Sequence, residues 1–465
     1  MYYIFNRYLP IKNMIIWVSE LILIFLIALS ASAIRFSFKE SHIINYDLQL
    51  LKSSLITGIY IITFYYFNLY SPELFRPGRQ MIIKLLQASS VGSIILFSIY
   101  FIFPELKTGR GISLLNILIL PPLFLTWRTL LSKWMRVNLP NSRVLIIGSG
   151  ELAKKIGSEI FNNCNEHGLK LVGFIDDDPA KFGQSIVNPG IVGGYGDITR
   201  IVNSEKISSI IVALHDRRAK LPMSALLGCK LKGVSIEEGE TFNERMTGKI
   251  PLDHLKPSWM VFSDGFKSLR SRKVVKRIFD ICLSFCGLIF ASPILLITSL
   301  FIKLESKGPI LYKQQRVGEN GKEFNIYKFR SMKHDAETST GPVWAKTDDD
   351  RTTRIGKIIR KLRIDELPQL INVIKGNMSF VGPRPERPHF VNKLKEVIPY
   401  YEMRTVVKPG ITGWAQIKYP YGATFQDALE KLQYDIYYIK NMSPLLDIMI
   451  FFWTIKVVLT GKGAR

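Results

Sequence analysis

Residues 143–153 read Arg-Val-Leu-Ile-Ile-Gly-Ser-Gly-Glu-Leu-Ala, and this stretch decides the fold of the middle of the 465-residue chain. Its apolar half is typical of a buried strand, and its Gly-x-Gly-x-x-Ala half is typical of a tight turn that leads into a helix. Strand patterns at 171–175 and 207–213 continue the alternation of strand and helix. We therefore expect a Rossmann-like α/β domain over residues 141–265.

The glycine turn is a candidate nucleotide site. In such a turn the pyrophosphate of a nucleotide can bind the N-terminus of the helix, so Gly148 and Gly150 are the candidate binding residues. The second strand pattern ends in Asp176-Asp177-Asp178, roughly where a ribose-binding acid would lie. A purely structural or regulatory domain fits the same residues equally well. No Tyr-x-x-x-Lys pair follows in this domain, which argues against hydride transfer.

Four long apolar runs fill the first 131 residues, at 15–34, 53–69, 85–103 and 111–127. A bilayer crossing needs about 20 apolar residues, so we predict a four-helix transmembrane bundle over residues 1–140. Basic residues gather before the first run, between the second and third, and after the fourth. The positive-inside bias then places both termini, and everything after the fourth run, in the cytoplasm.

The net charge of +24 is carried by the two ends of the chain, since residues 141–265 are neutral. Those ends also hold the apolar runs, which favours a membrane surface or a phosphate-bearing substrate over nucleic acid. Zinc-finger spacing and aromatic RNA-binding strands are absent from the sequence. Four cysteines are too few for a disulfide framework, and none has zinc-ligand spacing.

A fifth apolar run, 278–304, is expected to enter the membrane and return rather than cross it. Basic residues flank both of its ends, and a full crossing would place one cluster outside. Pro293 follows Ser292 in mid-run and removes the hydrogen bond to the carbonyl of Ile289. We therefore predict a re-entrant helix that breaks at Ser292-Pro293, with Asp280 paired to a neighbouring basic residue; a kinked fifth span is the alternative.

A pair of adjacent carboxylates, Asp365 and Glu366, precedes a helical pattern that starts at Pro368. A carboxylate there feels the positive end of the helix, so we expect it to stay ionised. An ionised carboxylate among guanidinium groups suits attack on phosphorus, and the second carboxylate can share a magnesium ion with a diphosphate. The arginines expected to surround the carboxylate are Arg360, Arg363 and Arg384. Exposed ion pairs on a basic helix that rests on lipid are the alternative, and composition alone does not decide.

Several motifs in one order resemble the bacterial sugar transferases, also called monotopic phosphoglycosyl transferases or polyprenyl-phosphate hexose-1-phosphate transferases. The matching stretches are Lys276-Arg-x-x-Asp280, Ser292-Pro293, Lys328-Phe-Arg-Ser-Met332, Asp365-Glu-Leu-Pro-Gln369, Pro383-Arg-Pro385 and Pro409-Gly-Ile-Thr-Gly-Trp-Ala-Gln416. The first 265 residues look like the four-helix and CoA-binding-like extension of the large members. The resemblance implies a membrane protein of class α plus α/β, with a mainly α monotopic catalytic domain over residues 266–465.

The resemblance implies a two-step reaction at the bacterial inner membrane. Asp365 would attack the β-phosphate of a UDP-sugar, expel UMP and hold the sugar-phosphate covalently. Undecaprenyl phosphate would then displace Asp365 to give undecaprenyl-diphospho-sugar, the first intermediate of exopolysaccharide, capsule or O-antigen. UDP-glucose or UDP-galactose is the expected donor, and N-acetylated sugars stay open.

The family's motifs also assign roles to single residues. Glu366, with Asp365, would hold magnesium. The residues expected to bind the substrate phosphates are Arg360, Arg384, Arg330 and Asp435. One departure matters: small members continue with Asn-Gly-Arg where this chain has Lys418-Tyr-Pro-Tyr-Gly422, so no binding residue is carried over from that loop.

Two other functions stay open from the sequence. A membrane-anchored nucleotide-sugar dehydratase or epimerase can carry a similar N-terminal half, but residues 266–465 contain no second Gly-x-x-Gly-x-x-Gly turn. A non-catalytic membrane scaffold is the other alternative. A homo-oligomer is compatible with the sequence, and we expect UDP-sugar, undecaprenyl phosphate and membrane lipid as partners.

Overall fold

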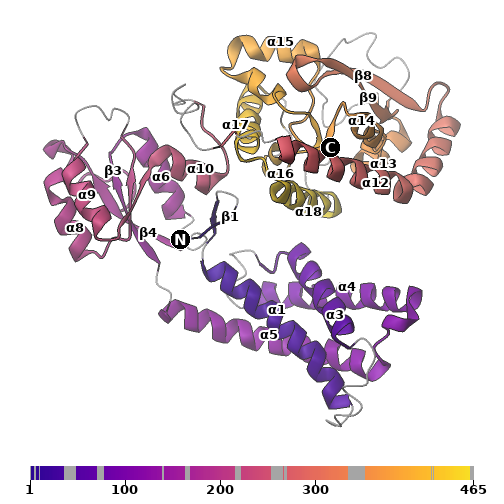
Figure 1. The fold of residues 1–465 in the computed structure, drawn as a ribbon, viewed down its shortest axis with the longest axis horizontal. Coiled ribbons are helices and arrows are strands. Elements are labelled where there is room, and N and C mark those ends of the chain that lie inside the picture. Colours follow the sequence, from indigo (N-terminus) through magenta and orange to yellow (C-terminus); the bar gives the residue numbers. More distant parts are fainter. Residues whose placement is uncertain are drawn as a thin grey trace. The chain divides into compact units, whose positions relative to one another are not determined.

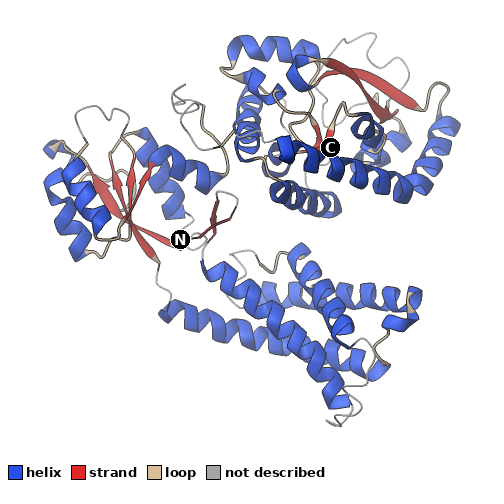
Figure 2. Cartoon of the chain, viewed as in Figure 1, coloured by secondary structure: helices blue, strands red, loops and turns tan. Residues whose placement is uncertain are grey.

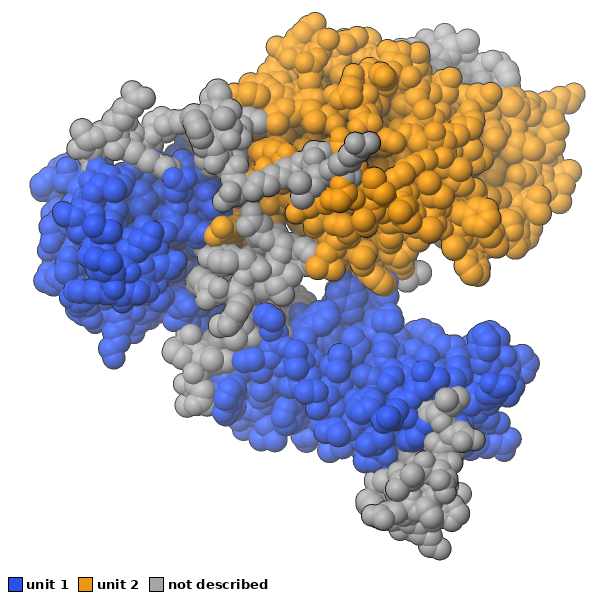
Figure 3. Space-filling model, in the orientation of Figure 1, with its two compact units in different colours: residues 1–242 blue, residues 243–465 orange. Residues whose placement is uncertain are grey.

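The structure is a computed structural model, and it describes residues 2–4, 7–9, 11–35, 49–70, 78–138, 141–162, 168–214, 221–252, 265–266, 270–332, 351–419, 422 and 424–460. The chain divides into two compact units, Met1–Phe242 and Asn243–Arg465 (Figure 3). The boundary between them falls inside α10 (Gly239–Thr247), so the second unit starts earlier than the catalytic domain expected from residue 266. The three-domain division stays a prediction beside these two units.

Long apolar helices dominate the first part of the first unit (Figure 1). After a hairpin of β1 (Tyr2–Ile4) and β2 (Arg7–Leu9) come α1 (Ile11–Arg35), α3 (Gln49–Tyr66), α4 (Arg79–Ile102) and α5 (Arg110–Asn138). Windows at 14–31, 79–102 and 110–135 are long and apolar enough to cross a membrane. The α3 helix forms where a span is expected, but within the described residues it is not long and apolar enough to be a candidate membrane span. A membrane-spanning role for α3 therefore stays a prediction.

A buried ion pair joins α1 to α5. Glu20, the one charged residue of its apolar run, accepts hydrogen bonds from Nε and Nη2 of Arg128, the latter at 2.8 Å. Neither side chain is exposed, and Arg128 also donates to the carbonyl of Leu69 at 3.1 Å. A charge in an apolar interior is costly unless it is paired and hydrogen-bonded, so this pairing explains how the helices tolerate Glu20.

The second part of the first unit is the expected α/β domain. Its parallel sheet has the order β5-β4-β3-β6-β7, and Figure 2 shows helices on both sides of it. The strands are β3 (Ser142–Ile147), β4 (Leu169–Ile175), β5 (Ile191–Gly193), β6 (Ser209–Val212) and β7 (Ser235–Glu238). The helices are α6 (Glu151–Asn162), α8 (Ile198–Ser204) and α9 (Met223–Leu231). The three strand patterns read from the sequence are confirmed.

The longest helix of the second unit is α12 (Arg270–Glu305), which has 36 residues, contains Pro293 and bends along its length (Figure 1). The carbonyl of Ile289, which loses its usual donor to the proline, accepts a hydrogen bond from the Ser292 hydroxyl at 2.7 Å. The Ser-Pro pair thus frees a carbonyl and satisfies it within one turn. By length and composition alone the window 271–305 is long enough to cross a membrane, so the re-entrant path stays a prediction.

The start of α12 is fixed by three polar residues, and their partners differ from the expected ones. Asp280 does not pair with a neighbouring basic residue but accepts a hydrogen bond from the backbone N–H of Phe380 at 2.9 Å. Lys276 instead pairs with Asp447 at 2.7 Å, and Arg277 donates to the carbonyl of Val373 at 2.6 Å. These partners come from elements about 100 residues or more away, so pairing within the helix was the wrong inference.

The remaining elements of the second unit pack beside α12. An antiparallel pair, β8 (Leu311–Val317) and β9 (Glu323–Phe329), precedes α13 (Arg354–Lys361), η6 (Ile364–Glu366) and α14 (Gln369–Lys375). A parallel pair, β10 (Ser379–Val381) and β11 (Gly410–Thr412), brackets α15 (Pro388–Val397) and η7 (Tyr401–Thr405). The chain then forms α16 (Trp414–Lys418), α17 (Phe425–Asn441) and α18 (Pro444–Thr460).

Candidate active site

The two carboxylates lie in the short turn η6, between α13 and α14. The backbone of Arg363 adopts a left-handed conformation with φ of 59°, which ends α13 and redirects the chain into η6. Pro368 then precedes the first residue of α14, as the sequence predicts. Asp365 and Glu366 are 9% and 8% exposed, so both are buried in the protein. Burial excludes the alternative in which they form exposed ion pairs on the surface of a helix.

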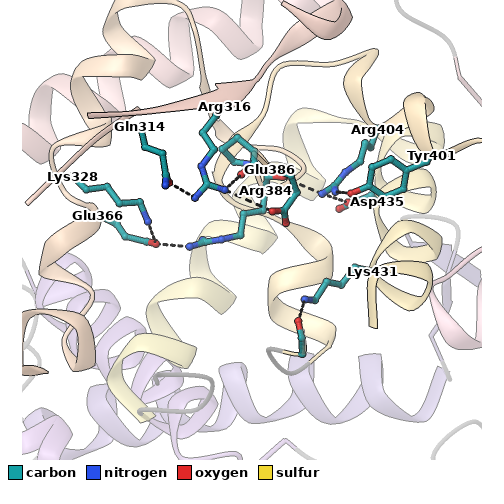
Figure 4. Close-up of polar contacts among 12 residues, drawn as sticks. Gln314, Arg316, Lys328, Glu366, Arg384, Glu386, Tyr401, Arg404, Lys431 and Asp435 are labelled. Carbon is teal, nitrogen blue, oxygen red and sulfur yellow. Dashed lines mark hydrogen bonds and ion pairs between the residues drawn. The ribbon is translucent and has the colours of Figure 1, made fainter. Parts of the chain in front are cut away.

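Two cations from distant elements bind the same oxygen of Glu366 (Figure 4). Lys328 Nζ on β9 lies 2.9 Å from Glu366 Oε1, and Arg384 Nη2 lies 2.5 Å from it. Burial alone would raise the pKa of Glu366, but Arg384 and Lys328 outweigh it and hold that pKa well below the usual range. Burial lowers the pKa of Lys328, while Glu366 opposes the shift. Glu366 is therefore a fixed anion at neutral pH.

Asp365 is the less readily ionised member of the pair. Burial and the neighbouring Glu366 charge raise the pKa of Asp365 to about 6, against the opposing effects of Lys328, Arg384 and Arg363. Its Oδ1 is buried and has no hydrogen-bond partner within the described part of the chain. Both carboxylates are thus mainly ionised at neutral pH, but Asp365 is protonated more readily than an exposed aspartate, because burial and a like charge raise its pKa. Lys328 and Arg384, rather than the start of α14, hold Glu366 ionised.

Two of the predicted phosphate-binding arginines have structural partners. Arg330 is buried and donates to the carbonyls of Ser306 and Lys307 at 2.8 and 3.0 Å, which holds the chain where it leaves α12. Arg360 donates to Thr352 Oγ1 at 3.3 Å. Their roles toward a phosphate stay predictions, and the contacts of Arg330 favour a structural role.

Asp435, the fourth residue assigned to phosphate binding, also lies close to a cation. Its Oδ2 is 3.0 Å from Arg404 Nη2, and the carboxylate is 2% exposed. Burial raises the pKa of Asp435 to about 6, although Arg404 lowers it. The Arg404 guanidinium therefore neutralises the buried Asp435 carboxylate within the protein. A residue that binds phosphate directly would not need such a partner from the protein.

Sequence reasoning missed Lys328 and Arg404 as site residues. Lys328 stands in the same motif as Arg330, two positions away, and the sequence alone gives no reason to prefer one cation over the other. The strand supplies the reason, since Lys328 lies within β9 and Arg330 lies just beyond its end. For Arg404 the sequence carries no signal, because the residue is outside the quoted motifs.

The donors present fit a magnesium ion. Among the described residues no group of three or more His, Cys, Asp or Glu side chains could hold a metal. Magnesium, however, commonly binds through one or two carboxylates together with substrate phosphates. The unpartnered Oδ1 of Asp365 and the adjacent Glu366 carboxylate provide such oxygen donors.

The candidate nucleotide turn has the expected geometry. Gly148 has φ of +111°, and a Cβ there would lie 2.7 Å from the carbonyl oxygen of Ala213, so glycine is required. Asp176, the first of the three acids after β4, accepts a hydrogen bond from Ser149 and lies 3.3 Å from Lys181 Nζ, so this acid already has partners within the domain. Nucleotide binding by Gly148 and Gly150 stays a prediction.

The chain is similar to known proteins over the part that contains this site. Residues 271–461 match the bacterial sugar transferase family, and residues 66–221 match a CoA-binding domain family. A UDP-glucose:undecaprenyl-phosphate glucose-1-phosphate transferase of Escherichia coli K12 is 33% identical over 344 residues, which is 71% of each chain. The chain belongs to the bacterial sugar transferase family.

Two further relatives align with different fractions of this chain and of their own length. A UDP-N-acetylgalactosamine-undecaprenyl-phosphate N-acetylgalactosaminephosphotransferase of Aeromonas hydrophila is 44% identical over 243 residues, 52% of this chain and 56% of that relative. The exopolysaccharide production protein PSS of Rhizobium leguminosarum bv. phaseoli is 42% identical over 199 residues, 41% of this chain and 98% of that relative. The chain thus matches little more than half the length of the first of these, and nearly all of the second.

Proposed function

We propose that this chain transfers a hexose-1-phosphate from a UDP-sugar to undecaprenyl phosphate, as the first step of exopolysaccharide, capsule or O-antigen synthesis. One observation carries the proposal. Asp365 is a buried carboxylate, one oxygen of which has no hydrogen-bond partner among the described residues, and it lies beside a second carboxylate that two cations hold in place. This arrangement supplies a nucleophile, and its cations can balance the charge of a diphosphate.

The reaction consists of two displacements at one phosphorus. An Asp365 oxygen attacks the β-phosphorus of the UDP-sugar, the bond from that phosphorus to the bridging oxygen breaks, and UMP leaves with the bonding electrons. An oxygen of undecaprenyl phosphate then attacks the same phosphorus and releases the Asp365 carboxylate. Arg384 and Lys328 position the dyad and neutralise phosphate charge, and bound magnesium would add further neutralisation of the diphosphate.

The sugar is the open part of the proposal. UDP-glucose and UDP-galactose remain the expected donors, and the glucose-1-phosphate transferase activity of the Escherichia coli relative agrees with glucose. The Aeromonas hydrophila relative acts on an N-acetylgalactosamine donor, so UDP-N-acetylgalactosamine is the second candidate.

Apolar helices and family membership make this a membrane-associated protein. We further propose the bacterial inner membrane, with both termini and the catalytic domain on the cytoplasmic side. The basic residues that flank the apolar runs support this orientation. Labelling of cysteines introduced into the loops, from each side of the membrane, tests it.

The test is UMP release by the full chain in nanodiscs that contain undecaprenyl phosphate and magnesium, with UDP-glucose, UDP-galactose and their N-acetylated forms as donors. Asp365→Asn should abolish release, while Asp197→Asn, an exposed acid of the middle domain, should leave it unchanged. Without acceptor, a labelled sugar-phosphate should stay on the wild-type protein only. Full activity of Asp365→Asn would refute the mechanism, and silence with every donor would favour the scaffold alternative.

A further inference from the structure

The loop that carries Arg384 is held at four successive carbonyls. The backbone N–H of Gly410 donates to the Pro383 carbonyl at 2.9 Å, and that of Val317 donates to the Glu386 carbonyl at 3.0 Å. Two side chains hold the carbonyls between them: Arg404 Nη2 donates to that of Arg384, and Arg316 Nη1 to that of Pro385, both at 3.0 Å. The backbone of the loop is therefore fixed on both sides of Arg384. Figure 4 shows Arg384 with Arg316 and Arg404, the two side chains that hold it.

Arg404 is itself held from three directions. It is 9% exposed, its Nη1 donates to the Tyr401 hydroxyl at 2.6 Å, and its guanidinium lies 5.2 Å from the centre of the Tyr401 ring. The third contact is Asp435, 3.0 Å away on α17. A buried guanidinium needs a counter-ion, because an unpaired buried charge is strongly destabilising. Asp435 supplies that counter-ion.

We propose that Asp435 and Arg404 are positioning residues for Arg384, so that Asp435 serves the reaction through Arg404 and not as a phosphate ligand. The chain of contacts runs from Asp435 to Arg404, through the Arg384 carbonyl, and from the Arg384 side chain to Glu366. The kinetic test of this inference rests on the proposed function. A second test, which measures the backbone of the loop, does not.

Misplacement of a catalytic group by about 1 Å can cost about 100-fold in rate, so a loosened loop should be kinetically visible. We expect Asp435→Asn and Arg404→Gln each to lower kcat by about 10–100-fold, the range that such a displacement allows. The half-saturating magnesium concentration should stay unchanged. Glu402→Gln is the matched control, because Glu402 lies in the same turn and, among the residues that the structure describes, its side chain forms an exposed pair with Lys395 at 4.0 Å and no other polar contact.

Double variants separate positioning from direct contact. If Arg404 acts through Arg384, Arg384→Gln/Arg404→Gln should be no slower than Arg384→Gln alone. If instead the losses of the two single variants multiply in the double variant, Arg404 contacts the substrate itself. A changed magnesium requirement in Asp435→Asn would mean that Asp435 binds the metal. Either result overturns the proposal. Tyr401→Phe, which removes a single hydrogen bond, is the milder variant if the others fail to fold, and its few-fold loss should likewise vanish in the Arg384→Gln background.

Hydrogen exchange of the peptide that spans residues 380–392, measured in the full chain, tests the positioning role without any measurement of activity. Asp435→Asn, Arg404→Gln and Tyr401→Phe should each speed exchange there, and Glu402→Gln should not. Unchanged exchange in the first three would overturn the positioning role even if UMP release is normal. Faster exchange in a chain that releases no UMP with any donor would leave the positioning role intact and refute only the proposed function.

Discussion

Replacing Lys328 by Met tests whether this lysine keeps the nucleophile ionised. Lys328 is the first of the cations that lower the pKa of Asp365, which burial and Glu366 raise to about 6. A unit charge 4 Å away is worth about 4 kcal/mol at an effective dielectric constant of 20, and each pKa unit is worth about 1.4 kcal/mol. We take about half of that as the net effect, since Arg384 remains, so the pKa of Asp365 should rise by about 1–2 units.

The direction of the pH effect follows from that shift. A raised pKa means that the carboxylate is lost at a higher pH, so the acid limb of the UMP-release profile should move from about pH 6 to about pH 7–8. Loss of Lys328 should lower the rate at every pH, because this lysine also positions Glu366 and neutralises phosphate charge. Protonation of Asp365 should add a further loss of about two- to tenfold at pH 7, and that part should disappear at pH 9. Lys375→Met is the control, because Lys375 is exposed and donates to the Tyr327 hydroxyl at 3.1 Å rather than to the dyad. An acid limb that stays near pH 6 in Lys328→Met would refute the electrostatic account.

Three further substitutions test buried polar contacts of the fold. Glu244→Gln removes the partner of Lys440, 2.6 Å away and equally buried, and should lower the free energy of unfolding of the second unit by about 3–5 kcal/mol in urea titrations. Glu20→Gln should likewise remove the anionic partner of the buried Arg128 and lower the melting temperature of the detergent-solubilised protein, whereas the double variant Glu20→Gln/Arg128→Met should recover most of it. Ser292→Ala removes one hydrogen bond, to the carbonyl freed by Pro293, and should cost about 0.5–1.5 kcal/mol without abolishing UMP release; no measurable loss would show that another donor replaces the hydroxyl.

The elements that could be read from the sequence are those whose cause is local. The apolar runs, the glycine turn and the helix that starts after Pro368 depend on residues within a few positions of each other. The same holds for Ser292 and Pro293, where the freed carbonyl and its new donor lie three residues apart. The adjacency of Asp365 and Glu366 marked the pair as a candidate, but only the resemblance of Asp365-Glu-Leu-Pro-Gln369 to a family motif assigned it to catalysis.

The partners of the dyad could not be read in the same way. Lys328 and Arg384 reach Glu366 across 38 and 18 positions of the chain, and they come from a strand and from a loop. Nothing in their spacing tells which of several cations folds back onto Glu366. Arg330 is an example of a cation whose partner could not be predicted from spacing. It lies about as far from the dyad in sequence as Lys328 does, but it binds the end of α12. The raised pKa of Asp365 could not be read from the sequence for a related reason, because burial is a tertiary property.

The catalytic unit of this chain extends beyond the part that matches its family. The match starts at residue 271, yet buried contacts reach back to Glu244 on α10. Glu244 pairs with Lys440 on α17, and the indole N–H of Trp414 donates to the carbonyl of Gly248 at 2.7 Å. Because α17 also carries Asp435, the residues before 271 support the helix whose carboxylate holds Arg404. A truncation at residue 266 would leave Lys440 buried without this partner, so the proposed chemistry should require a chain that begins before Glu244.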